Sequence, residues 1–453
     1  MNDDAESAKS DQDLKFPPGP DINHALNFWE SPLKSFTELI HQYGDIVSLD
    51  PNTHKVYLIN HPDNIKHVLQ DNYRNYTKDS DSFKPVLGNG LFVSEGDFWL
   101  RQRRMMQPAF HRQNLEQMIP AIVKTTTELL RRWQTIAEQG ESIDIFQEMT
   151  KLMINISATT MFGVDIADDI QSLADALKTA QEYVYYQGWD YLEQLDTQGA
   201  EKNEFQKAVE IIDQIVYRII REGRQNPQNN TNLLSTLLAA TDEATGNNMS
   251  EEQLRDEIVG LLAGGQSTNA IALTWIFYTL AMHPDAEQRI YTELTEVLGQ
   301  RPPTAQDLSN LGYTRQVIDE VLRLYPPSWL TARRSIKSDE IAGYHIPANA
   351  EVFICPYIVH RHPSFWEDPE RFNPERFAPG HFTTNRSHFA YLAFSGGPHI
   401  CIGSNFSTMA LQTILAIIMR TYRLRLTSDA IIEPQPQILL QPETDIPMKL
   451  EKR

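Results

Sequence analysis

The sequence is poor in cysteine, in long apolar runs and in positive charge. Two cysteines in 453 residues cannot staple a secreted scaffold, and they favour a reducing compartment such as the cytoplasm. No run of about 18 apolar residues occurs, so we expect no membrane-spanning helix or membrane anchor. The 40 Lys and Arg against 60 Asp and Glu give a net charge of −20, which argues against a nucleic-acid partner. With 41% hydrophobic residues, however, the chain can bury a large core.

The chain offers few places for a domain boundary. Residues 1–15 carry five acids, two lysines and no apolar run, which predicts a disordered acidic tail and no signal peptide. The length alone would suggest two or three domains. The polar stretches at 221–232 and 241–248 are nevertheless short and lie between helical patterns, so we interpret them as loops.

The periodicity of the chain predicts a mainly α fold with a minor β-sheet. Strands are predicted at 46–49 and 55–59, and helical spacing dominates 64–299. The pattern from 251 to 282 predicts one helix of 32 residues, roughly 48 Å long at about 1.5 Å per residue. Ser250 and Gln253 have the spacing of a capping box before it. A last helix is predicted at 405–422.

The most informative segment is a glycine-rich loop that contains one of the two cysteines: Phe394-Ser395-Gly396-Gly397-Pro398-His399-Ile400-Cys401-Ile402-Gly403. Its glycines would let the backbone approach a flat partner closely. Because a helix is predicted just after Cys401, the helix N-terminus and loop N–H groups would stabilise a thiolate that can bind a metal. The alternative is a buried, inert cysteine, which is the role we expect for Cys355.

This loop resembles the haem-ligand loop of the cytochrome P-450 superfamily. The family pattern Phe-x-x-Gly-x-(Arg/His)-x-Cys-x-Gly is matched at Phe394, Gly397, His399, Cys401 and Gly403. Four further family motifs occur in the family's order: Trp99 with Arg103, residues 263–268, Glu320 with Arg323, and Arg376 within Pro374-Glu375-Arg376-Phe377. Together they extend the resemblance from Phe16 to the C-terminus.

The resemblance implies the cytochrome P-450 fold, a helical prism around a buried haem, and a single haem domain over 16–453. It implies haem b (iron protoporphyrin IX), with Cys401 as the thiolate ligand of the iron. The residues that would contact the haem are Trp99, Arg103, Ala263, Gly264, Arg334, Phe394, Ser395, His399 and Gly403, and four of them (Trp99, Arg103, Arg334 and His399) would meet the propionates. Arg334 is the best match for its position, although Arg333 adjoins it.

The motif Glu320-x-x-Arg323 has two interpretations. A Glu–Arg pair three residues apart is most often a solvated helix face. The helix around this pair is largely apolar, however, so a charged pair there needs a further partner, and Arg376 would supply it. We therefore predict a structural network of these three residues that holds the cysteine loop.

The midpoint of the long predicted helix departs both from ordinary helices and from the family. Gly264 and Gly265 cost about 1 kcal/mol each against alanine, but they permit the approach of a large planar group, and a local opening would admit a small ligand. The alternative is a glycine-mediated helix crossing beside a satisfied polar cluster. The family places an acid and a threonine where this chain has Gln266 and Ser267. Glutamine cannot donate and recover a proton as a carboxylic acid does, so Ser267 or Thr268 with water would deliver protons.

The resemblance also places the substrate pocket, at 83–92, 179–191 and 326–331. The side chains predicted to line it are Phe83, Val86, Leu87, Leu91, Phe92, Tyr185, Tyr186, Trp189, Trp329 and Leu330. Such a pocket implies a lipophilic or aromatic small molecule. The alternative is that the aromatic rings pack only against neighbouring helices.

These observations predict a soluble, bacterial-type haem-thiolate monooxygenase of secondary metabolism. It would hydroxylate its substrate with O₂ and two electrons from a ferredoxin-type donor and its reductase, and it would act as a monomer. Gln266 motivates an alternative, an enzyme of oxidative coupling, desaturation or peroxide-driven oxidation. A second alternative is a non-catalytic haem-binding sensor. Arg101 and Arg104 could form a basic patch for an acidic donor, or simply a solvated helix face.

Overall fold

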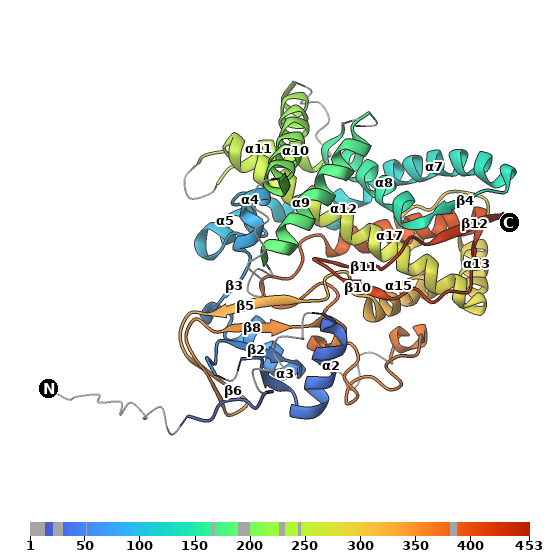
Figure 1. The fold of residues 1–453 in the computed structure, drawn as a ribbon. Helices are drawn as coiled ribbons and strands as arrows, with labels where there is room; N and C mark the ends of the chain where they lie inside the picture. Colours follow the sequence, from blue (N-terminus) through green and yellow to red (C-terminus); the bar gives the residue numbers. More distant parts are fainter. Residues whose placement is uncertain are drawn as a thin grey trace. The chain divides into compact units, whose positions relative to one another are not determined.

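The computed structural model describes residues 14–20, 30–50, 52–164, 166, 168–188, 200–225, 232–242, 246–380 and 387–453. Within these residues the chain is mainly helical with small sheets, as the sequence predicts (Figure 1). It divides into two compact units, each assembled from segments far apart in the sequence. Most of the predicted acidic tail, residues 1–13, lies outside the described residues.

The first unit comprises the described parts of 1–79, 330–369 and 386–400. Its five-stranded sheet has the order β1-β2-β8-β5-β3, in which β2 and β8 are parallel and the other pairs antiparallel. The strands are β1 (Ile46–Ser48), β2 (Val56–Ile59), β3 (Tyr76–Lys78), β5 (Thr331–Ser335) and β8 (Glu351–Ile354). The other elements include α2 (Pro32–Tyr43), α3 (Pro62–Lys66), η2 (His67–Asp71), α16 (Pro356–Val359), η8 (His388–Ala390) and the hairpin β6 (Asp339–Ile341) and β7 (Tyr344–Ile346).

The core of this unit lies around β2 and β8. The last three residues of each strand are apolar and buried on both faces, which is typical of central strands. Tyr57, Ile59 and Val352 pack in one cluster with Val68 and Phe389. The predicted strands at 46–49 and 55–59 are confirmed, each one residue shorter than expected.

The second unit comprises the described parts of 80–329, 370–385 and 401–453. Its helices are α4 (Lys84–Leu87), α5 (Gly96–Met106), α6 (Arg112–Glu116), α7 (Ile119–Gln139), α8 (Ile145–Ser157), α9 (Ile170–Gly188), α10 (Ala200–Gln225), α11 (Leu233–Ala239), α12 (Glu251–Met282), α13 (Pro284–Leu298), α14 (Ala305–Leu308), α15 (Gly312–Leu324), the 3-10 turn η7 (Pro374–Phe377) and α17 (Ser404–Thr421). Two small antiparallel sheets join them, β4 (Ser142–Asp144) with β12 (Pro447–Lys452) and β9 (Tyr422–Leu426), and β10 (Pro434–Pro436) with β11 (Leu440–Pro442).

Helix α12 is the central element of this unit and has the predicted bounds. It packs against α8, α10, α15 and α17, and residues 269–280 are buried on every face (Figure 1). The Ser250 hydroxyl caps it by accepting from the Gln253 N–H at 3.1 Å. The reciprocal half of the predicted capping box, in which the Gln253 side-chain oxygen would accept from the Ser250 N–H, is not formed. In the described part of the chain, no helix is long and apolar enough to cross a membrane.

Candidate active site

Cys401 lies in the second unit, three residues before α17 begins. The residue is exposed by surface area, yet enough protein surrounds its thiol that desolvation raises the thiol's pKa. The Gly403 N–H, the charge of Arg103 and the Ser404 N–H act in the opposite direction on this pKa. Cys401 is thus an exposed residue with two N–H groups and a cation beside its sulfur, and these three groups favour the thiolate that a sulfur-ligated iron requires.

Trp99 and Arg103 stand one turn apart on α5, so their side chains project from the same face. Trp99 is buried, and Arg103 is partly buried. Desolvation lowers the pKa of Arg103, while the charge of Cys401 raises it. The structure thus brings together the cysteine and the arginine of two motifs that lie 298 residues apart in the sequence (401 − 103).

The loop ahead of Cys401, residues 394–400, belongs to the first unit. Gly397 has a φ of +68°, and a Cβ there would lie 1.9 Å from the carbonyl oxygen of Leu69 in η2. Only glycine therefore lets this loop lie against η2. Ser395 also has a positive φ, +61°, and the ring of His399 stands edge-on to that of Tyr73 at 6.4 Å. The glycines of this loop were expected to let the backbone approach a flat partner closely. At Gly397 the close neighbour is instead the backbone of Leu69.

The two adjacent arginines of β5 point to opposite faces of the strand. Arg334 forms an ion pair with Asp79 and keeps 42% of its side-chain surface exposed. Arg333 is only 7% exposed, and its Nη1 donates to the Thr331 hydroxyl at 3.1 Å and to the Ala332 carbonyl at 2.8 Å. Arg333 is therefore the arginine that the strand directs inward, whereas the family resemblance favoured Arg334 as the haem contact.

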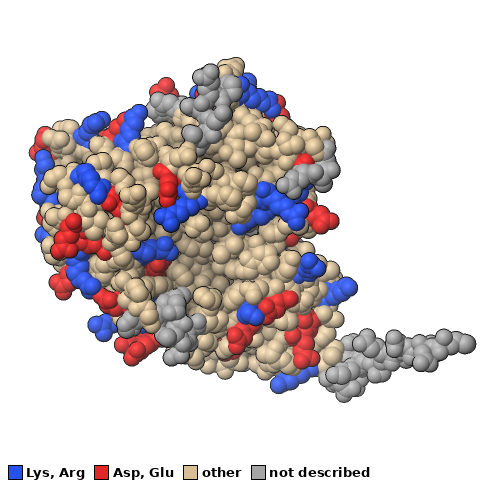
Figure 2. All heavy atoms as spheres, turned by 180° about the vertical axis from the view of Figure 1, so that it is seen from behind, with Lys and Arg blue, Asp and Glu red and all other residues tan. Residues whose placement is uncertain are grey.

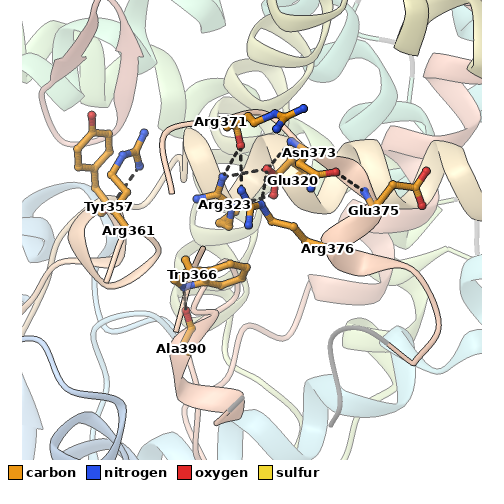
Figure 3. Close-up of polar contacts among 10 residues, drawn as sticks. All are labelled: Glu320, Arg323, Tyr357, Arg361, Trp366, Arg371, Asn373, Glu375, Arg376 and Ala390. Carbon is orange, nitrogen blue, oxygen red and sulfur yellow. Dashed lines mark hydrogen bonds and ion pairs between the residues drawn. The ribbon is translucent and has the colours of Figure 1, made fainter. Parts of the chain in front are cut away.

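Glu320, Arg323 and Arg376 meet in the second unit as a buried charge network (Figure 3). Arg323 donates to both carboxylate oxygens of Glu320, at 2.7 and 2.9 Å, and Arg376 donates to one of them at 3.3 Å. The backbone N–H of Asn373 adds a bond of 2.8 Å to the same carboxylate. Both guanidinium groups also reach the carbonyl of Arg371, at 3.4 Å each. The network ties α15 to the 371–376 segment and excludes the solvated-face interpretation of Glu320, which is 0% exposed.

The middle of α12 is a continuous helix rather than an opened one. The carbonyls of Gly264 and Gly265 each accept a side-chain bond from four residues on, from Thr268 at 2.7 Å and Asn269 at 2.6 Å. Gly264 is exposed, between the partly buried Ala263 and Gly265, and a Cβ there would meet nothing within 4 Å. This open face, which Ala263 adjoins, leaves room for a planar group to approach the helix.

Ser267 forms two hydrogen bonds to amide side chains. Its hydroxyl donates to Oε1 of Gln266 at 2.7 Å, and Nε2 of Gln181 on α9 donates to the hydroxyl oxygen at 3.0 Å. Gln266 and Ser267 are both buried, at 4% and 9% exposure. Gln181 lies within the predicted pocket segment 179–191 but was not among the predicted site residues. No local signal separates it from other glutamines of the helix.

The predicted pocket residues of the second unit include buried and exposed side chains. Val86 and Leu87 are buried, Leu91 is partly exposed, and Phe92 is 53% exposed with its ring edge-on to Phe83 at 5.2 Å. Trp329 is buried and donates to the carbonyl of Gln437 at 2.6 Å, and the Tyr185 hydroxyl donates to the carbonyl of Pro436 at 3.2 Å. Leu330 belongs to the first unit, while the Tyr186 side chain and Trp189 lie outside the described residues.

Comparison with known proteins identifies the family. The Cytochrome P450 family model matches residues 16–449, and the chain belongs to this family. Cyclooctat-9-en-7-ol 5-monooxygenase of Streptomyces melanosporofaciens is 34% identical over 90% of this chain and 88% of its own. Pentalenene oxygenase of Streptomyces avermitilis is 30% identical over 92% of each chain. The fold matches the crystal structure of the cytochrome P450DA heme domain with a TM-score of 0.88, at 22% identity, over 97% of this chain and 98% of that one.

The protein is therefore a cytochrome P450 monooxygenase, with a haem iron as its cofactor and a redox partner as its electron source. This confirms the family, the fold and the enzyme class predicted from the sequence. The non-catalytic sensor is not supported, because the named relatives are monooxygenases or oxygenases.

Proposed function

We propose that this P450 hydroxylates a lipophilic small molecule of terpenoid type, in a single haem domain that spans residues 16–453. The observation that carries the haem assignment is an exposed cysteine, Cys401, whose sulfur has two N–H groups and Arg103 beside it. The substrate class is supported by the relatives named for cyclooctatenol and pentalenene oxidation, and by the apolar side chains of the 83–92 segment.

The proposed cofactor is haem b, which supplies the oxidising chemistry when it is bound. Cys401 would ligate its iron, and the Gly403 and Ser404 N–H groups would hold the sulfur in its thiolate form. Ala263 and Gly264 would face the ring, and Trp99, Arg103 and His399 would hold the propionates. For the remaining arginine we propose Arg333 in place of Arg334, because the guanidinium of Arg334 already neutralises Asp79.

The remaining haem-loop residues would shape the loop rather than react. Ser395 takes a left-handed backbone conformation one residue after Phe394, which turns the chain toward Gly397.

Glu320, Arg323 and Arg376 would fix the segment 371–376, as a positioning network without contact to substrate. Ser267, with Gln266 and Thr268, would hold the polar groups from which protons reach the substrate side.

The amide pair around Ser267 favours a second candidate function, oxidative coupling, desaturation or peroxide-driven oxidation. Neither Gln266 nor Gln181 can release and regain a proton at neutral pH. A reaction that needs little proton delivery would tolerate this arrangement. The product formed for each pair of electrons consumed separates the two candidates: tight coupling to a hydroxylated product in the wild type excludes the second.

We further propose that a ferredoxin-type donor supplies the electrons and that the protein is a monomer; the cytoplasmic location stays a prediction. On the face shown in Figure 2, basic side chains are interspersed among acidic ones, so a donor would have to recognise a local group of charges. Arg101 is engaged in an ion pair with the buried Asp242, which leaves Arg104, exposed on the same helix, as the better docking residue.

The thiolate assignment has a spectroscopic test. The ferrous CO complex should show the red-shifted Soret band of a thiolate-ligated haem, and Cys401→Ser should lose that band. Cys355→Ser is the matched control, because Cys355 is fully buried in the first unit. The CO complex of this variant should show the same Soret band as the wild type. A wild type without the shifted band, or a Cys401→Ser protein that keeps it, would refute the assignment.

The substrate class is tested by the low-to-high-spin shift with cyclic terpenes and terpene alcohols, and no shift with any of them would refute it.

A further inference from the structure

Three consecutive charged residues near the start of α12 bind the backbone of α4 and of the segment that follows it. Arg255 donates from Nη1 to the carbonyl of Val86 at 2.8 Å. Asp256 and Glu257 accept backbone N–H bonds from Asn89 at 2.7 Å and Leu91 at 3.0 Å. The three side chains are almost completely buried, with exposed fractions of 7%, 7% and 1%. We name them the α12 clasp.

The segment is shaped to fit this clasp. Gly88 has a φ of +54°, and a Cβ on it would lie 2.1 Å from a carboxylate oxygen of Asp256. A Cβ on Gly90 would lie 2.9 Å from the backbone carbonyl oxygen of Asp256. Both glycines are therefore required for the close approach, because any side chain there would push the segment off the helix.

The clasp also reaches a third element. Arg255 forms an ion pair with Asp213 of α10 at 2.6 Å and another with Asp256 at 3.1 Å. One guanidinium thus joins α10, α12 and the carbonyl of Val86. Burying three charged side chains contributes little to the stability of the fold, because the cost of their desolvation offsets most of the attraction between the opposite charges. Directional bonds to backbone groups do fix geometry, however, and they are what these residues make.

We propose that Arg255, Asp256 and Glu257 are positioning residues that set the place of Val86, Leu87 and Leu91 and thereby determine which ligand sizes the enzyme admits. The inference rests on the proposed function in one respect, that the segment 83–92 lines the substrate pocket. Val86 and Leu87 are held between the Arg255 contact and the Asp256 contact. Movement of the segment would therefore move these two apolar side chains together.

The first test measures the clasp itself and needs no substrate. Asp256→Asn keeps the size of the side chain but removes the charge that the Asn89 N–H faces. Hydrogen exchange of the holoenzyme should then be about tenfold faster at the Asn89 and Leu91 amides. Glu252→Gln, an exposed position on the first turn of the same helix, is the matched control and should leave these amides unchanged. If Asp256→Asn does not fold, Asp213→Asn weakens the clasp from α10 and should speed exchange in the same peptides. Unchanged exchange in a folded variant would overturn the proposal.

The second test separates a size-determining role from a merely structural one. Binding of 4-phenylimidazole and of the bulky azole clotrimazole can be followed by the haem spectrum, whatever the natural substrate is. The ratio of their two dissociation constants should change about fivefold or more in Asp256→Asn and stay constant in Glu252→Gln. Faster exchange with an unchanged ratio would overturn the size-determining role. The proposed terpenoid substrate fails independently, if no terpene shifts the spin state while the azole ratio still changes.

Discussion

Gln181 on α9 donates a hydrogen bond to the hydroxyl of Ser267 on α12, with 3.0 Å between Nε2 and Oγ. Ser267 uses its own proton to bond Oε1 of Gln266 at 2.7 Å. Three neutral polar side chains therefore form a chain, and two of them, Gln266 and Ser267, stand where the family carries an acid and a threonine. Because none of them titrates near neutral pH, the orientation of the Ser267 hydroxyl should be independent of pH.

Removing Gln181 should change how efficiently electrons are converted into product. Gln181→Leu frees the oxygen of Ser267 from its donor, so the hydroxyl can rotate, and Ser267→Ala removes the hydroxyl altogether. We expect the product formed per electron pair to fall severalfold in Ser267→Ala and by a smaller factor in Gln181→Leu. Because both changes act on one hydroxyl, the double variant should resemble Ser267→Ala alone. Gln171→Leu, which alters an exposed glutamine bonded to Asp175 on the same helix, is the control. Additive losses would contradict a shared role.

Gln266→Glu should make both coupling and stability depend on pH. Gln266 is 4% exposed, so burial would raise the pKa of a carboxyl placed there. Below its unfolded-state pKa the variant should be as stable as the wild type, because the group is protonated in both states. As the pH rises through the folded-state pKa, a penalty of roughly 1–3 kcal/mol should develop. Urea denaturation of both proteins at pH 5 and pH 8 checks this, and an equal difference at both pH values would contradict it.

The sequence predicted the elements of this site better than the contacts between them. The bounds of α12 follow from its capping residue and from Pro284, which are local signals. The Gln181–Ser267 contact joins residues 86 positions apart (267 − 181) and depends on how α9 packs on α12, which no local pattern encodes. The choice between Arg333 and Arg334 likewise depends on a contact that the sequence does not reveal. Because side chains alternate along a strand, one of the two arginines must face inward. Which of them does so depends on the ion pair of Arg334 with Asp79, a residue from a distant part of the sequence.

Truncating Glu320 should destabilise the protein strongly. Glu320→Ala leaves the buried guanidinium groups of Arg323 and Arg376 without their shared carboxylate. Breaking a buried pair in this way costs about 3–5 kcal/mol. Glu375→Ala removes a carboxylate from the same segment whose ion pair with Arg289 is exposed, so its cost should stay below about 1 kcal/mol. Urea denaturation compares the two, and similar small losses would show that the network contributes little. If Glu320→Ala does not fold, Arg376→Lys should still cost more than Glu375→Ala.

A pH-dependent stability change should come from Glu351 of the first unit. Burial, followed by the nearby carboxylate of Asp79, raises the pKa of Glu351 from 4.5 to about 7, although the charge of Arg334 opposes the rise. Glu351 and Arg334 are directly opposite each other on β8 and β5, and Arg334 is bonded to Asp79, so the charge of one guanidinium acts on both carboxylates. The folded state thus retains a proton that the unfolded state has already lost at intermediate pH.

The sign of this effect follows from the raised pKa. The contribution of Glu351 to stability is complete below about pH 4.5, decreases as the pH rises toward about 7, and is constant above. Glu351→Gln removes the titration, so the difference in unfolding free energy between wild type and variant should fall by on the order of 2 kcal/mol across this window. Denaturant titrations at half-unit steps from pH 4.5 to 8 would measure it. Glu340→Gln, an exposed glutamate of the same unit, is the control and should show a flat difference. A flat difference for Glu351→Gln as well would mean that Glu351 is ionised throughout and that Arg334 neutralises both carboxylates.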